Sequence, residues 1–169
     1  MDTLRFISLI SFVFLFTNCY KTEYMISDES FHSIYMRDWK TSVCPKKVVL
    51  EKYMKNTDFK KLLSSDSDFD IRNCDSIYAS LNQRIISPNV TYIGQINYDI
   101  KLVIDDSLVY RITDIKDGID TVSGRSGPGK WIIMNNIKSL VINGHKLDNS
   151  KTPLSFNIPT KLGKVIKKK

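Results

Sequence analysis

The sequence predicts an α+β fold, with a helical N-terminal half packed on a C-terminal antiparallel β-sheet of about five or six strands. Two observations support this prediction. Before Ser87-Pro88 the apolar residues recur at intervals typical of helices, whereas after it they alternate with polar residues as in strands. With 42% hydrophobic residues in 169, the chain has enough apolar surface for one folded core.

The chain begins with a stretch typical of a secretory signal. Arg5 precedes an uncharged apolar run over residues 6–16. As a helix this run would extend about 16 Å, against roughly 30 Å of bilayer hydrocarbon, so it is too short for a stable membrane span. We therefore expect residues 1–19 to be a signal peptide and residues 20–169 to form a single globular domain. The protein is then exported, to the periplasm, to a bacterial membrane as a lipid-anchored protein, or to the medium.

Cys19 directly follows the apolar run, in a position that suggests processing. The stretch Phe16-Thr17-Asn18-Cys19 resembles a bacterial lipoprotein lipobox. This resemblance implies that Cys19 is lipidated and becomes the mature N-terminus. The alternative is an ordinary signal-peptidase cut ahead of Tyr20, because Thr17 and Cys19 would stand three residues and one residue before the bond.

Either outcome removes Cys19 from thiol pairing and leaves Cys44 and Cys74 in the mature chain. Two thiols in an oxidising compartment favour one disulfide. A bridge that closes a loop of about thirty residues would stabilise the fold by roughly 3 to 4 kcal/mol. The alternative is a pair of buried, reduced thiols, which becomes the better interpretation if the chain is not exported.

Four helices are expected in the N-terminal half. The first covers residues 26–39, where acidic residues precede aromatic residues at helical spacing. The second begins at Pro45, a residue favoured in a first turn, and directs Lys52 toward water. A short third helix includes residues 59–63, and a fourth covers residues 75–85 after an aspartate N-cap. Both cysteines then lie just before a helix, so the bridge would clamp two helix starts together.

Two hairpins are expected in the C-terminal half. Residues 96–104 and 108–112 alternate between apolar and polar, and a three-residue turn between them sets Ile104 opposite Leu108. A two-residue turn would instead set apolar residues opposite charged ones. The second hairpin turns at Asn143-Gly144, which favours a two-residue loop and places Leu140 opposite Leu147. Residues 131–134 and 154–158 supply two further strands.

A glycine-rich segment, residues 124–130, has the glycine and lysine spacing of a phosphate-binding Walker loop. Trp131 replaces the Ser or Thr that binds magnesium in that motif, and a strand follows where the motif needs a helix N-terminus. We therefore expect either a simple connection between strands or a partner-binding loop that presents Arg125 and Lys130.

No cofactor and no metal site are expected. Asp66, Asp68 and Asp70 alternate as at the start of a calcium loop, but Ile71 replaces the glycine that the loop requires. The chain has only two histidines, in different predicted elements, and nothing in the sequence indicates a Ser-His-Asp arrangement. No catalytic residue is assigned.

The charge of the chain suggests an acidic partner or membrane surface. The formal net charge is +7, and residues 161–169 are rich in lysine. This basic terminus would add to membrane association if Cys19 were lipidated. Nucleic acid is not expected, because the basicity is modest and no strand motif combines aromatic and basic residues. Asn89-Val90-Thr91 is a glycosylation sequon, relevant only in a cell that modifies such sites.

These observations favour a small exported domain that binds another protein. Envelope-located inhibitors and immunity proteins, which antagonise a toxin or a hydrolase, suit such a size and composition by analogy. The alternatives are an exported hydrolase whose catalytic residues are dispersed along the sequence, and a structural envelope lipoprotein.

Overall fold

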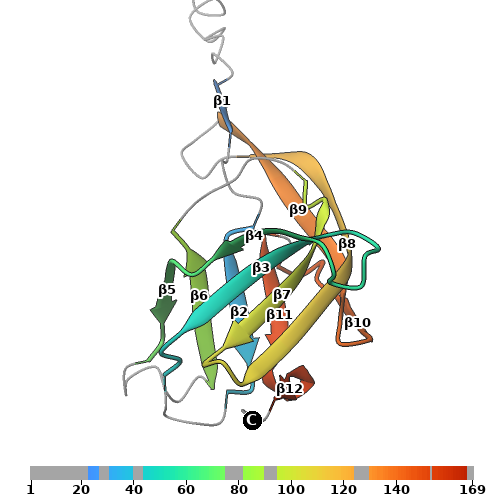
Figure 1. Cartoon of the computed structure of the whole chain (residues 1–169). Helices are drawn as coiled ribbons and strands as arrows, with labels where there is room; N and C mark the ends of the chain where they lie inside the picture. Colours follow the sequence, from blue (N-terminus) through green and yellow to red (C-terminus); the bar gives the residue numbers. More distant parts are fainter. Residues whose placement is uncertain are drawn as a thin grey trace, which may run out of the picture.

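The computed structural model describes residues 23–26, 31–39, 44–74, 82–89, 95–123, 130–152 and 154–166, and these are nearly all β (Figure 1). The strands in chain order are β1 Glu23–Ile26, β2 Ser33–Arg37, β3 Val48–Met54, β4 Leu62–Asp66, β5 Phe69–Arg72, β6 Gln83–Pro88, β7 Tyr98–Ile104, β8 Leu108–Ser123, β9 Lys130–Ile142, β10 His145–Asp148, β11 Ser155–Pro159 and β12 Lys164–Val165. A 3₁₀ turn, η1, covers Thr160–Leu162.

The strands form two sheets. Sheet A has eight strands in the order β1-β9-β8-β7-β3-β4, with β10 paired to β9 and β12 paired to β8. Sheet B has four strands in the order β11-β2-β6-β5. The pairs are antiparallel except β1 with β9 and β11 with β2, which are parallel. In Figure 1 sheet B lies behind sheet A, so the fold is a β-sandwich.

The core lies between the two sheets. In β3 and β7 alternate residues face inward, and Val48, Leu50 and Lys52 of β3 and Ile100, Leu102 and Ile104 of β7 are buried there. Sheet B contributes the buried side chains of β2, β6 and β11. Fully buried apolar side chains of the core include Ile34, Met36, Leu50, Ile86, Ile96, Ile100, Leu102, Ile104, Tyr110, Ile112 and Phe156.

The strands β8 and β9 are much longer than their neighbours and extend beyond the sandwich as an arm (Figure 1). Their register shifts on either side of Lys116, where a β-bulge bends the ribbon. Beyond the bulge, β1 pairs with the outer edge of β9. The first described strand therefore lies at the far end of the arm.

The predicted helical N-terminal half is wrong, because no α-helix occurs among the described residues. The first two predicted helices overlap β2 and β3, and the third overlaps a turn and β4. The fourth lies outside the described residues over 75–81 and ends inside β6. Two sheets replace the predicted layer of helices on one sheet.

The sequence of β3 explains the error. Val48 and Val49 fit a helical spacing with later apolar residues, but they equally fit the start of a strand. The two β-branched valines and the pairing on both sides favour the strand. Lys52, which was expected to face water, consequently faces inward and is only 8% exposed.

Both predicted hairpins of the C-terminal half are confirmed. Ile104 lies opposite Leu108 across the three-residue turn, and Leu147 lies opposite Leu140. Asn143 and Gly144 have φ of 48° and 88°, the left-handed values that a two-residue turn of this kind requires. Residues 131–134 fall within β9, and residues 155–158 fall within β11, which belongs to sheet B; Leu154 precedes that strand. No helix of the described residues is long and apolar enough to cross a membrane.

Candidate protein-binding edge

β4 is the last strand of sheet A and the candidate binding site. It pairs with β3, and no strand of the described chain pairs with its other edge. Leu62 and Leu63 are 53% and 52% exposed, so two adjacent apolar side chains of this strand face solvent. A free strand edge with exposed apolar side chains is a site to which another chain can add a strand.

The ladder between β3 and β4 determines which backbone groups of β4 face the free edge. The N–H of Met54 donates to the carbonyl oxygen of Lys61 at 3.0 Å, so these two residues form a hydrogen-bonded pair. Hydrogen-bonded and non-hydrogen-bonded pairs alternate along an antiparallel ladder. The next pair, Tyr53 with Leu62, is therefore non-hydrogen-bonded, and the N–H and C=O of Leu62 point away from β3.

Ser65 has the same backbone orientation as Leu62, although an irregularity of the strand lies between the two residues. The register shifts by one residue at Leu63, the extra residue of a β-bulge. Ser64 then lies opposite Lys52 at a hydrogen-bonded position, and Ser65 lies opposite Glu51 at a non-hydrogen-bonded one. The backbone groups of Ser65 therefore also face the free edge.

The turn between β3 and β4 folds over the outer face of sheet A. The rings of Phe59 and Tyr53 meet edge to face, with centroids 5.3 Å apart, and the guanidinium of Arg111 lies 5.0 Å from the Phe59 ring. Arg111 also lies 3.7 Å from the carboxylate of Asp58. Asp58 and Phe59 have φ of 49° and 57°, a strained conformation for a bulky residue such as phenylalanine. Phe59 and Arg111, whose types are enriched in protein interfaces, thus lie on the outer face of sheet A over β3 and β8, and not on the free edge of β4 itself.

A hydrogen-bonded ion pair fixes Tyr53 under this turn. Lys101 Nζ lies 2.8 Å from Glu51 Oε2, and the hydroxyl of Tyr53 donates to the same oxygen at 2.6 Å. Partial burial acts to raise the pKa of Glu51, but the hydrogen bonds and the charge of Lys101 outweigh it and lower this pKa. The hydrogen bond to Glu51, with burial and the Glu51 charge, raises the pKa of Tyr53 to about 12.

The two ends of β4 carry opposite charges. Lys60 and Lys61 precede the strand and are exposed, whereas Asp66 ends it. Asp66 Oδ2 lies 3.1 Å from Nζ of the inward-facing Lys52, whose ammonium group also lies 5.4 Å from the ring of Tyr98. The edge strand is therefore basic at its start and acidic at its end.

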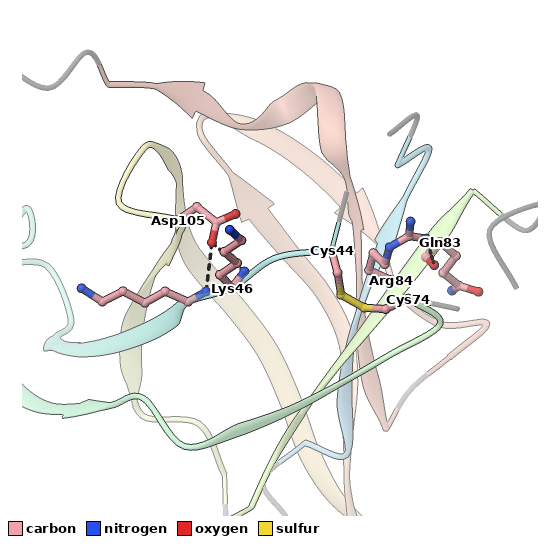
Figure 2. Close-up of a disulfide and its surroundings, with 7 residues drawn as sticks. Cys44, Lys46, Cys74, Gln83, Arg84 and Asp105 are labelled. Carbon is pink, nitrogen blue, oxygen red and sulfur yellow. Dashed lines mark hydrogen bonds between the residues drawn. A yellow bond between two sulfur atoms is a disulfide. The ribbon is translucent and has the colours of Figure 1, made fainter. Parts of the chain in front are cut away.

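The predicted disulfide joins Cys44 to Cys74, with Cα atoms 5.3 Å apart (Figure 2). Cys44 precedes β3 in sheet A and Cys74 follows β5 in sheet B, so the bridge ties the two sheets together and does not clamp helix starts. Asp105 supports the same region, because its Oδ1 accepts the N–H of Lys46 at 2.8 Å. The loop closed by the bridge contains β3, β4 and β5 and so holds the free edge on the sandwich.

The other predicted site residues lie elsewhere. Cys19 and Arg125 fall outside the described residues. Lys130 is the first residue of β9 and lies opposite Glu23 of β1 in the arm. Because β1 and β4 are the two terminal strands of sheet A, Lys130 lies at the opposite side of the sheet from the β4 edge.

The three alternating aspartates each have a different contact. Asp66 pairs with Lys52 as above, Asp70 lies 3.2 Å from Arg72, and Asp68 accepts a hydrogen bond from the side chain of Asn89 at 2.7 Å. Within the described ranges, no three or more His, Cys, Asp or Glu side chains are grouped to hold a metal ion. The contact with Asp68 also places the asparagine of the predicted sequon beside the β4–β5 connection.

A shallow pocket of about 310 Å³ lies on another part of the surface, near the beginning of β2 and the middle of β9. Its lining is mostly apolar and comes from His32, Tyr35, Met134, Asn136, Thr152, Leu154 and Ser155. These residues include no carboxylate or thiol, and the pocket carries no further assignment.

Leu62 and Leu63 were expected to lie in a short helix, and their exposure on an edge strand was not predicted. One local signal does separate them from core residues. They are adjacent rather than alternating, and they lie between Lys60-Lys61 and a run of serines and aspartates. Charged residues flanking a short apolar strand are typical of sheet edges.

Comparisons with known proteins identify no relative of this chain. No protein family, curated protein or solved structure matches it.

Proposed function

We propose that this chain is an exported domain that binds another protein by strand addition at β4, as an antagonist of a toxin or a hydrolase. The observation behind this proposal is the β4 edge itself. Leu62 and Ser65 direct backbone donors and acceptors outward, and Leu62 and Leu63 expose more than half of their surface. An added strand would satisfy these backbone groups and cover the leucines in one step.

The surroundings of the edge support recognition of a defined partner. Main-chain hydrogen bonds give affinity in strand addition, while neighbouring side chains give specificity. Phe59 of the β3–β4 turn and Arg111 of β8 meet on the outer face of the same sheet, and both are of types enriched in protein interfaces. Lys60 and Lys61 add positive charge at one end of the strand, which favours acidic residues in the partner segment.

The exported location is supported by two features. The apolar run over residues 6–16 followed by Cys19 has the arrangement of a signal sequence. The disulfide between Cys44 and Cys74 is a bond that persists in oxidising compartments such as the periplasm or the medium.

The test is capture of a partner from the envelope and secreted fractions of the source organism with three forms of residues 20–169. Wild type and Val165→Lys, which alters an exposed apolar residue on β12, should retain one stoichiometric protein. Leu62→Lys should lose it, and the bound protein should slow amide hydrogen exchange at Leu62 and Ser65. A partner that binds Leu62→Lys as well as wild type would refute the site, and turnover of an envelope polymer without any partner would refute the function.

A further inference from the structure

The free edge of β4 has a pattern that matches itself. In an antiparallel pair, residues directly opposite each other share a face of the sheet, and positions with outward backbone groups meet. Leu62 and Ser65 lie opposite the outer-face residues Tyr53 and Glu51, so their side chains lie on the outer face. Both also direct their backbone groups to the free edge. Leu62 of one copy can therefore lie opposite Ser65 of a second copy, because the two residues share a face of the sheet and both have outward backbone groups.

We infer that β4 pairs with β4 of a second copy of this chain, in an antiparallel dimer with two-fold symmetry. The inference rests on the proposed function, because both use the same free edge. Leu63 of each copy lies opposite Ser64 of the other copy, and the two-fold axis lies between these two pairs. Each of the two Leu62–Ser65 pairs exchanges two N–H···O=C bonds. The dimer covers the edge when no other partner occupies it.

The charges of β4 agree with this register. Lys61 of each copy lies opposite Asp66 of the other copy, at a non-hydrogen-bonded position where the side chains come closest. Lys61 is exposed, and Asp66 keeps its Oδ2 on Lys52 while a second cation approaches from the edge. Because the dimer is two-fold symmetric, the attraction occurs twice.

Neighbouring registers fit less well. A shift by one residue in either direction sets Leu62 opposite Ser64 or Asp66, which lie on the inner face like Leu50 and Lys52. A one-residue slip reverses the face of every side chain, so these registers would direct the leucines of one copy against inward-facing polar groups of the other.

The dimer is expected to be weak and concentration-dependent. It joins one five-residue strand from each copy, so its area lies at the low end for specific interfaces, below roughly 1,200 Å². A weak dimer suits an edge that a tighter partner must reach, because the partner segment then displaces the second copy.

The test combines sedimentation velocity over a wide concentration series with hydrogen exchange on residues 20–169. Wild type should shift from monomer to dimer as concentration rises, and the Leu62 and Ser65 amides should exchange more slowly in the dimer. Lys61→Glu places like charges opposite Asp66 twice and should weaken dimerisation by about tenfold or more. Lys146→Glu makes the same charge change on exposed β10 and should dimerise like wild type.

The outcomes separate this inference from the proposed function. A monomer at all concentrations, or a dimer that Lys61→Glu leaves unchanged, would overturn the β4 dimer. If a captured protein partner still protects the Leu62 and Ser65 amides in that case, the proposed function stands. Conversely, a dimer sensitive to Lys61→Glu with no captured partner supports the inference and removes support from the antagonist.

Discussion

β3 has two antiparallel neighbours, and they differ in almost every respect. β7 pairs with it through seven residue pairs in one register, and its inward side chains are buried. β4 pairs through four, with a register shift, and only Asp66 among its residues is even partly buried. The same strand therefore has one neighbour that completes the core and another that leaves an edge open. The closed side of β3 contributes to the core, and the open side is the one at which we propose that a partner binds.

The difference follows from what each strand covers. β7 lies inside sheet A, and its inward residues Ile100, Leu102 and Ile104 belong to the same buried apolar cluster as residues of sheet B. β4 lies at the margin, where Lys52 and Asp66 close the core with an ion pair instead of apolar side chains. A strand that adds little to the core is free to change its surface for recognition.

One leucine on each neighbour of β3 gives the sharpest test of this difference. Leu102→Ala, in β7, should lower the free energy of unfolding by about 2–5 kcal/mol, because it leaves a cavity in a closed core. Leu62→Ala, in β4, should change it by no more than about 0.5 kcal/mol, because its side chain is already half exposed. Denaturant unfolding of both variants measures this, and equal losses would mean that β4 belongs to the core.

Removing the disulfide should loosen the open side first. Cys44→Ser with Cys74→Ser should lower the free energy of unfolding by about 2–4 kcal/mol, since the bridge closes a loop of 30 residues. The loss of protection should be greatest at β4 and β5, which lie inside the loop, and smaller at β8 and β9. Hydrogen exchange with and without the bridge reports both effects; uniform loss over all strands would contradict this assignment.

The Lys52–Asp66 ion pair at the margin of the core should contribute less to the free energy of unfolding than Leu102 or the disulfide. Asp66→Asn removes the charge that compensates the nearly buried Lys52, so the free energy of unfolding should fall by about 1–3 kcal/mol. Asp70→Asn is the matched control, because Asp70 and Arg72 are both half exposed and their pair should contribute under about 0.5 kcal/mol. Thermal or denaturant unfolding separates them, and equal effects would show that Lys52 is already solvated.

The smallest expected effect is a pH dependence on the outer face. The folded-state pKa of Glu51 is lowered from 4.5, so its contribution is fully present above pH 4.5 and is lost as the pH falls through the folded value. Glu51→Gln should therefore cost about 1 kcal/mol or less at neutral pH and nothing at the acidic limit. Unfolding of the wild type and of Glu51→Gln between neutral and acidic pH tests this prediction. A loss of stability from the substitution that grows as the pH falls would contradict it.

Local turn chemistry made the second half of the chain predictable. Asn143-Gly144 requires a specific two-residue turn, and the apolar pattern around Asp105 fixes one register, so each hairpin could be derived from about ten residues. The disulfide was predictable because subtracting Cys19 left only two thiols. These features depend on neighbours in sequence.

The rest depends on contacts that are remote in sequence. β3 and β4 are too short for the apolar period to distinguish a strand from a helix, and their partners decide it. The parallel pairs β1–β9 and β11–β2 join segments more than a hundred residues apart, which no local pattern encodes. The exposure of Leu62 and Leu63 follows from the position of β4 at the end of the sheet order, and in the sequence only the flanking charged residues indicate it.

The uninterrupted length of β8 has a consequence for orientation. Val165 of β12 lies opposite Leu108 at its start, whereas Tyr24 of β1 reaches its end through Trp131 and Ser123. Fifteen residues of strand separate these points, about 50 Å, and Figure 1 shows β1 and β12 at opposite ends of the molecule. A flat surface that contacts β1 therefore contacts β12 at the same time only if the molecule lies lengthwise along it.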